Sequence, residues 1–115
     1  MADPVWLLLM FDLPVVTKEQ RRRATKYRKM LLDLGFSQTQ LSVYSKYLLN
    51  GAGVRGLLPW VRDSIPPNGA VRMIRLTDEQ WASMYRFHGP NSLPPEDRPE
   101  QLGLFMAIDA EESES

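Results

Sequence analysis

Seven consecutive apolar residues, at positions 5 to 11, are followed at once by Asp12, Leu13 and Pro14. An apolar run of this length, bounded by a charge and a proline, predicts a strand that is buried on both faces. Side chains that emerge where such a strand ends commonly build functional sites. Asp12 is therefore a candidate functional residue, although an acid after a strand can also simply cap a turn.

The length of 115 residues predicts one domain that can bury a core without disulfides or metal staples. The chain contains no cysteine, which excludes a disulfide and a thiolate metal site and is consistent with a reducing compartment. The apolar run is too short to span a bilayer and lacks the basic flank and the cleavage pattern of a signal peptide. We therefore expect a cytoplasmic protein with no membrane partner.

The formal net charge of zero hides an uneven distribution of charge. Residues 1–50 carry eight Lys and Arg against four Asp and Glu, and residues 51–88 carry five against three. Residues 89–115 carry one against seven, so the first 88 residues have a net charge of +6 and the remainder −6. A basic body favours a polyanionic partner, while an acidic tail at residues 106–115 is expected to be solvated, with screening or tethering as alternatives.

A helix is predicted to begin after Thr17 and to end near Leu34, because Thr17 and Gln20 have the spacing of a capping box and Gly35 is a typical helix stop. The stripe expected to face the core consists of Ala24, Tyr27, Leu31 and Leu34. The candidate nucleic-acid-binding face consists of Arg22, Lys26 and Lys29, flanked by Arg21 and Arg28. Outward Lys and Arg are ordinarily only solvated, so phosphate binding and simple solvation both stay open.

Alternation, helical spacing and prolines predict the remaining elements. Residues 36–49 form one strand, or two strands joined by a tight turn near Ser45. The later elements are a helix at 51–65 that ends before Pro66 and Pro67, a strand at 71–76, a short helix at 77–84 capped by Thr77, and, as an option, a further short strand at 85–88.

The order strand, helix, one or two strands, helix, strand predicts an α+β fold of the ferredoxin-like type (split βαβ, βαββαβ), with two helices on one face of an antiparallel sheet. We divide the chain into a domain at residues 1–88, a proline-rich linker with a docking strand at 89–105, and an acidic tail at 106–115. The apolar residues Leu102, Leu104 and Phe105 have no obvious place in so small a core. We expect them to dock on an exposed sheet edge of a second subunit.

Two further patterns carry less weight. The segment from Gly51 to Gly56 matches G-x-G-x-x-G, but its glycines follow the wrong strand and the chain is too short for a doubly wound sheet, so we interpret it as a flexible helix entry. His88 is the only histidine and has no partner motif nearby, so a structural or merely exposed role is expected for it.

Asp12 alone cannot hold the two ions of a two-metal nuclease. Two copies of Asp12, one from each subunit of a homodimer, could meet across a two-fold axis and share one Mg²⁺ ion, with waters and phosphate oxygens completing the ligand set. The metal-binding and catalytic roles predicted for Asp12 therefore require a dimer.

Several short motifs occur together, and in order, across residues 5–105. They are Phe11-Asp12-Leu13-Pro14, Ala24-Thr25-Lys26-Tyr27-Arg28-Lys29, Gly35-Phe36, Gln40-Leu41-Ser42-Val43-Tyr44, Pro66-Pro67-Asn68-Gly69-Ala70-Val71-Arg72, Thr77-Asp78-Glu79-Gln80, Phe87-His88-Gly89 and Gln101-Leu102-Gly103-Leu104-Phe105. In this combination the sequence resembles the CRISPR-associated Cas2 family, most closely the members that accompany type II systems.

The resemblance implies a ferredoxin-like homodimer that bridges two dimers of the CRISPR Cas-one integrase and helps capture spacer DNA, a role in antiviral defence. It also implies metal-dependent endonuclease activity, with Asp12 at the position of the family's Mg²⁺-binding aspartate. The last strand commonly crosses to the partner subunit in this family, which agrees with the displaced position of Leu102, Leu104 and Phe105.

Our leading hypothesis from the sequence is a non-catalytic subunit that binds double-stranded spacer DNA by its backbone. The alternative is a Mg²⁺-dependent phosphodiesterase that cleaves RNA or DNA through paired Asp12 carboxylates. A third class, a small RNA-binding module, has weak support because no aromatic pair typical of such modules lies on a recognisable strand.

Overall fold

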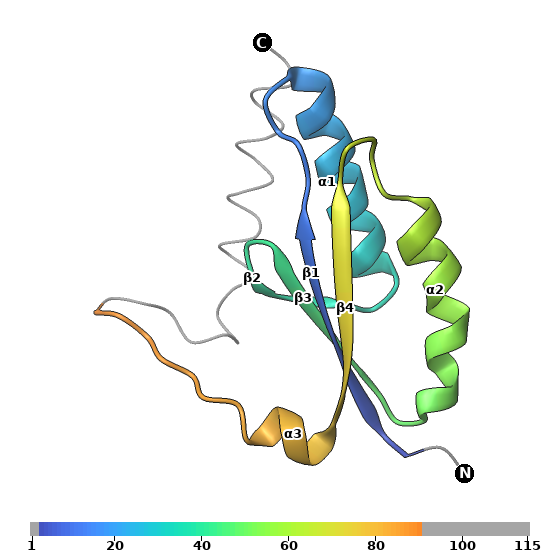
Figure 1. The fold of residues 1–115 in the computed structure, drawn as a ribbon, viewed down its shortest axis with the longest axis vertical. Helices are drawn as coiled ribbons and strands as arrows, with labels where there is room; N and C mark the ends of the chain where they lie inside the picture. The colour runs from blue at the N-terminus through green and yellow to red at the C-terminus, as the bar shows by residue number, and fades with distance from the viewer. Residues whose placement is uncertain (1–2, 91–115) are drawn as a thin grey trace.

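The computed structural model describes residues 3–90, which form a four-stranded antiparallel sheet with helices packed against it (Figure 1). The elements in chain order are β1 (Val5–Asp12), α1 (Lys18–Asp33), β2 (Ser37–Gln40), β3 (Val43–Leu48), the 3₁₀ turn η1 (Gly51–Gly53), α2 (Val54–Asp63), β4 (Ala70–Thr77) and α3 (Asp78–Ala82). The strand order is β2-β3-β1-β4, with β1 antiparallel to both β3 and β4. This arrangement confirms the predicted α+β, ferredoxin-like βαββαβ fold.

The central strand β1 is buried on one face only, so the prediction of burial on both faces is wrong for the described chain. Its odd-numbered residues Val5, Leu7, Leu9 and Phe11 are buried, whereas its even-numbered residues are partly or fully exposed and end in Asp12. The physical reason is that α1 and α2 both pack against the odd-numbered side. An antiparallel sheet can leave its other face uncovered in this way.

Residues of α1 fill most of the space between the helices and the sheet. Ala24, Tyr27 and Leu31 recur at helical spacing and are at most 2% exposed, as the stripe predicted. The Tyr27 ring meets Phe11 edge-on, with ring centroids 6.1 Å apart, and its hydroxyl donates a 2.9 Å hydrogen bond to the carbonyl oxygen of Val61. Tyr27 therefore joins both helices to the core face of β1.

Both ends of α1 are fixed by local hydrogen bonds. At the start, the Thr17 hydroxyl accepts from the Gln20 backbone N–H and the Gln20 side chain accepts from the Thr17 N–H, which confirms the capping box. At the end, Gly35 has φ +93° and its N–H donates to the Leu32 carbonyl, while the N–H of the buried Phe36 donates to the Leu31 carbonyl. This pair of bonds is a Schellman motif, in which glycine supplies the left-handed residue.

Residues 37–48 form two strands, which was one of the two predicted arrangements. The turn lies at Leu41 and Ser42, so its predicted position near Ser45 is wrong. Ser45 is instead buried within β3, where its hydroxyl shares a 2.8 Å hydrogen bond with the Thr39 hydroxyl. Ser42 also ties the turn to β1, because its carbonyl accepts a 3.0 Å hydrogen bond from the Phe11 N–H.

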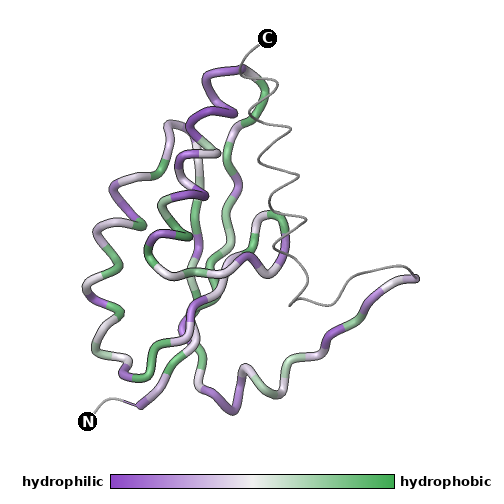
Figure 2. The backbone as a smooth tube through the Cα atoms, turned by 180° about the vertical axis from the view of Figure 1, so that it is seen from behind, coloured by the Kyte–Doolittle hydropathy of each residue, from purple (hydrophilic) through white to green (hydrophobic). Residues whose placement is uncertain are grey.

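The helix α2 follows η1 directly, and Val54 and Val61 form its buried stripe. Figure 2, viewed from the helix side, shows apolar and polar segments alternating along both long helices. Gly51 opens η1 with its N–H bonded to the Asp3 carbonyl, and an added Cβ would lie 3.1 Å from both that oxygen and Val5 Cγ1. The segment from Gly51 to Gly56 is therefore a helix entry, as the sequence predicts, although Gly51 itself is tightly packed, whereas an added Cβ at Gly53 or Gly56 would meet no close neighbour.

The short helix α3 begins at a second capping box, formed by Thr77 and Gln80. It ends at Ala82, slightly before the predicted limit of Met84. The optional strand at residues 85–88 does not form within the described chain, where Tyr85 and Phe87 are 86% and 87% exposed. A strand there would need a neighbour to accept its backbone hydrogen bonds, and residues 3–90 place none beside it.

Several predictions fall on residues that the structure does not describe. They concern the linker beyond residue 90, the docking residues Leu102, Leu104 and Phe105, and the acidic tail at 106–115. Within residues 3–90, no helix has both the length and the apolar character needed to cross a membrane.

The burial of the Tyr27 hydroxyl makes the stability of the fold sensitive to alkaline pH. Burial raises the pKa of the Tyr27 hydroxyl from 10.0 to about 12. Between these pH values the unfolded chain releases this proton while the folded chain keeps it, so the contribution to stability is complete below pH 10 and is lost as pH rises toward 12.

We predict that Tyr27→Phe lowers the free energy of unfolding at neutral pH by about 1–2 kcal/mol, because the buried Val61 carbonyl loses its donor. The same substitution should weaken the decline of stability above pH 10. Urea denaturation at pH 7 and at about pH 10.5 would measure the free energy of unfolding and its decline with pH. Tyr85→Phe, on an exposed side chain, is the matched control, and an equal effect of both substitutions would contradict the assignment.

Candidate functional site

Asp12 is the last residue of β1, so it lies at one end of the sheet face that α1 and α2 leave uncovered. It is exposed, and its Cα partner on β4 is Ala70. Because side chains alternate along a strand, Asp12 points to the same side as Met10 and Leu8, away from α1 and α2. The structure therefore places the carboxylate beside the apolar residues of this face rather than beside the core.

The uncovered face, which we call the open sheet face, carries apolar side chains from three strands. Its apolar members are Trp6, Leu8 and Met10 of β1, Val43 and Tyr47 of β3, and Ile74 and Leu76 of β4. Ser45 and Arg72, which pair with Leu8 and Met10, are polar residues on the same face. Ile74 pairs with Leu8 and is 45% exposed, and Tyr47 pairs with Trp6 and is 40% exposed. A contiguous apolar surface of this kind on a small domain is typical of an interaction site.

The helix α3 covers the end of the open sheet face that lies farthest from Asp12. The Trp81 ring stacks on Trp6 with centroids 4.2 Å apart, and Trp6 Nε1 donates a 2.7 Å hydrogen bond to Asp78. Tyr47 leans on the same indole, and desolvation together with the nearby Asp78 carboxylate raises the pKa of its hydroxyl. This aromatic cluster was not predicted from the sequence, because its members are far apart along the chain.

Metal ligands are sparse in the described part of the chain. Residues 3–90 contain no group of three or more His, Cys, Asp or Glu side chains that could hold an ion. His88 is exposed and Asp12 stands alone as the acid at the strand end. One subunit therefore offers a single carboxylate at this position, which by itself is too few ligands for a protein-held metal.

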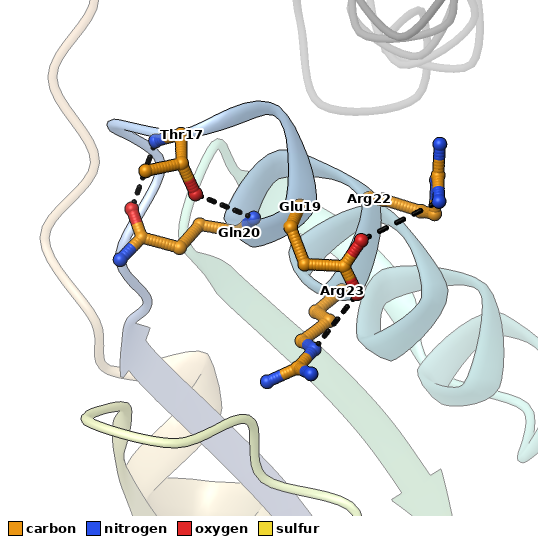
Figure 3. A network of polar contacts seen from close by, with 5 residues as sticks. All are labelled: Thr17, Glu19, Gln20, Arg22 and Arg23. Carbon is orange, nitrogen blue, oxygen red and sulfur yellow. Dashed lines mark hydrogen bonds and ion pairs between the residues drawn. The ribbon is translucent and has the colours of Figure 1, made fainter.

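The cationic face of α1 is partly neutralised from within the helix. Arg22 and Arg23 both contact Glu19, with nitrogen–oxygen distances of 3.4 Å and 3.2 Å (Figure 3). Lys26 and Lys29 are exposed and form no ion pair with any residue at positions 3–90. These two lysines are therefore the cations of α1 most available to an anionic partner, with Arg22 one turn before them.

Two of the predicted cations occupy other positions. Arg28 was expected to flank the exposed face, but it is only 4% exposed and its guanidinium carbon lies 5.9 Å from the centre of the Phe11 ring. The reason is its helical position next to Tyr27, which carries the side chain into the core. Arg21 is partly buried and donates hydrogen bonds to the carbonyls of Val15 and Val16, so it fastens the loop before α1.

A groove between α1 and α2 was not predicted from the sequence. It has a volume of about 360 Å³. Its lining residues are Lys26, Lys29, Met30, Asp33, Leu34 and Trp60. Trp60 is 59% exposed and lies outside the buried stripe of α2. The helical spacing of Val54 and Val61 could have shown this, since Trp60 falls outside the stripe that they define.

The fold and these surfaces define a small ferredoxin-like domain with an apolar sheet face and an exposed cationic helix. A sequence profile of the CRISPR associated protein Cas2 family matches residues 5–84, from the start of β1 to just after α3. The matched segment includes Asp12, the cationic face of α1 and both capping boxes.

Individual relatives agree with the profile. A CRISPR-associated endoribonuclease Cas2 from Paracidovorax avenae is 40% identical over 101 residues, which are 88% of this chain and 94% of the relative. A protein of the same name from Flavobacterium psychrophilum is 34% identical over 101 residues, 88% of each chain. One from Streptococcus mutans is 37% identical over 83 residues, 72% of this chain and 78% of the relative. The chain therefore belongs to the Cas2 family of CRISPR-associated proteins.

Proposed function

We propose that this chain is the CRISPR adaptation subunit that bridges two Cas-one integrase dimers and binds spacer duplex DNA through its phosphate backbone. The observation that carries the proposal is the row formed by Arg22, Lys26 and Lys29 on α1, which we call the cationic row. These residues follow one another at intervals of four and three, so they share one side of the helix. At 1.5 Å per residue the row spans roughly 10 Å, enough to contact successive phosphates of one strand.

The rigidity of α1 supports binding to a regular duplex. The capping box fixes its first turn, the Schellman motif fixes its last, and Tyr27 anchors its middle. Cations on such a helix hold their spacing without a large loss of backbone entropy on binding. Contacts to phosphates position the duplex without reading its bases, which suits a protein that handles spacers of many sequences.

The bridging role further requires a two-fold assembly, and we propose that the open sheet face is covered by a second copy of this chain. The face is largely apolar, with Arg72 beside Met10, and lies opposite α1 and α2, so pairing there would leave both cationic rows accessible. Symmetric pairing of one patch with itself is the commonest way to close a homodimer. It would also explain why half-exposed apolar side chains such as Ile74 of the edge strand β4 lie on this face.

Removal of Lys26 and Lys29 tests the duplex-binding surface. We predict that the double substitution Lys26→Ala and Lys29→Ala weakens binding to duplex DNA similarly for all sequences. It should also lower the slope of log affinity against log salt by about one for each phosphate that the variant no longer neutralises. Fluorescence anisotropy titrations between low and moderate salt would measure both quantities.

The matched control removes two cations from α2 instead, through Arg55→Ala and Arg62→Ala. Both side chains are exposed, and Arg62 already pairs with Asp63 at 2.7 Å. A smaller loss of affinity is expected for this control. Equal losses in the two variants would mean that DNA responds to net charge alone, and an unchanged salt slope in the lysine variant would remove the cationic row from the interface.

The proposed dimer is tested by placing a charge on the open sheet face. We predict that Ile74→Glu converts a dimer into a 13.2 kDa monomer, because an unpaired carboxylate buried in an apolar interface is strongly disfavoured. Sedimentation equilibrium would give the mass. Leu58→Glu is the matched control, since Leu58 is 42% exposed but lies on α2, behind the sheet. A monomeric wild type, or a control that dissociates equally, would contradict the proposed interface.

A second candidate function is metal-dependent cleavage of a phosphodiester bond, and two observations favour it. The relatives carry the name endoribonuclease, and Asp12 lies on the open sheet face that we propose as the dimer interface. Symmetric pairing of that face would bring in a second Asp12 carboxylate. One or two carboxylates with waters and substrate phosphate oxygens is an ordinary ligand set for Mg²⁺, so the residues fit this ion in a dimer but not in a single chain.

In this candidate mechanism, a bound Mg²⁺ would supply Lewis-acid stabilisation of the phosphate and a more acidic water. The Asp12 carboxylate would hold the ion, and the cationic row would hold the nucleic-acid strand. Within residues 3–90, Asp12 belongs to no group of three or more His, Cys, Asp or Glu side chains that could supply a general base beside a metal. The arrangement therefore favours the bridging role over efficient catalysis.

Substitution of Asp12 separates the two candidate functions. We predict that Asp12→Asn lowers any Mg²⁺-dependent cleavage by roughly 10- to 100-fold, a loss typical of disturbed metal sites, while spacer integration by the complex with the Cas-one integrase is retained. Asp63→Asn is the control, as Asp63 is an exposed acid on α2. Cleavage that survives in Asp12→Asn must arise elsewhere or from a contaminant. Integration that fails while the dimer persists would show that the carboxylate is needed for bridging.

A further inference from the structure

The groove between α1 and α2 combines cationic, aromatic and acidic side chains. Lys26 and Lys29 lie in the second half of α1, and Asp33 and Leu34 follow at its C-terminal end. The Trp60 ring comes from α2 and lines the same groove. One lining therefore holds two ammonium groups, one exposed indole and one carboxylate.

These groups match the parts of a nucleotide. Ammonium groups such as those of Lys26 and Lys29 bind phosphate oxygens, and an exposed indole stacks on the flat face of any base. The Asp33 carboxylate can accept hydrogen bonds from base N–H groups but would repel a phosphate. The volume of about 360 Å³ is within the ordinary size range of small-ligand sites.

The exposure of Trp60 also leaves its ring available to contact a ligand. The other two tryptophans, Trp6 and Trp81, stack on each other, and the Trp6 indole N–H donates a hydrogen bond to Asp78. Trp60 is 59% exposed, and no ring contact or hydrogen bond joins it to another residue within positions 3–90. An exposed aromatic side chain in the same groove as two lysines is a combination found where single-stranded nucleic acids are bound.

We propose that this groove binds one unpaired nucleotide of a DNA strand, with its base stacked on Trp60 and its phosphates on Lys26 and Lys29. The inference rests on the proposed DNA-binding role of the cationic row, and it adds a preference for duplexes with single-stranded ends over fully paired ones. A free nucleotide has the same chemistry as an unpaired nucleotide in a strand, so the experiment must distinguish these two sources.

The test compares three DNA ligands of equal duplex length. One is blunt, one has a short single-stranded extension with bases, and one has the same extension built from abasic sugar phosphates of equal charge. Wild-type protein is expected to bind the extension with bases about tenfold more tightly than the abasic one. Trp60→Ala should abolish this difference, and Trp60→Phe, which retains an aromatic ring, should keep most of it.

Blunt duplex serves as the internal control, because Trp60→Ala should leave its affinity unchanged within about twofold while the lysine substitutions weaken it. If wild-type protein binds the extensions with and without bases equally, the nucleotide site in the groove is wrong but the duplex-binding surface stands. If substitution of Lys26 and Lys29 leaves the affinity for blunt duplex unchanged, the proposed duplex-binding surface is wrong. Circular dichroism of Trp60→Ala would verify that the variant is folded, as expected for an exposed side chain.

Titration with deoxyadenosine monophosphate supplies the last comparison. Weak binding of this free nucleotide, with no saturable quenching of Trp60 fluorescence at micromolar concentration, is expected if the strand is the ligand. The Trp60→Phe variant identifies which part of the signal comes from Trp60. Saturable quenching at micromolar nucleotide would overturn the assignment to a DNA strand, and equal binding of base-containing and abasic extensions would overturn the site.

Discussion

The structure depends on the one-sided burial of β1. This strand lies between β3 and β4, and its odd-numbered side chains are covered by the two long helices through contacts centred on Tyr27. The other elements are positioned by their contacts with β1 and the two long helices. The same geometry that builds the core also presents the even-numbered side chains, with Asp12 at their end, on the face that α1 and α2 leave uncovered.

The position of α1 follows from the same layer. Its apolar stripe is held against β1, so the opposite side of the helix, with Arg22, Lys26 and Lys29, is directed to solvent. Glu19 neutralises part of the charge in the first turns, which concentrates the remaining positive charge beside the groove that contains Trp60. Core packing and surface chemistry are thus set by one helix with two faces.

Local patterns of the sequence were enough to place most elements. The capping boxes at Thr17 and Thr77 were evident because they are determined by residues only three apart. Features that depend on distant residues were not predicted correctly. The one-sided burial of β1 depends on where both long helices pack. The hairpin turn lies at residues 41–42 rather than near Ser45, where the sequence predicts it. The burial of Arg28 could not be predicted either, since charge suggested solvent while its place beside Tyr27 carried it into the core.

The alternation of β1 also limits how the protein can change in evolution. Inserting or deleting a single residue within this strand would exchange Leu7 and Leu9 with Leu8 and Met10, so the core would receive the side chains of the open sheet face and solvent would receive those of the core. The same eight positions therefore determine both the side chains of the core and those of the open sheet face. Divergence in β1 must proceed by substitution, whereas changes in length can be absorbed by the turn at residues 41–42.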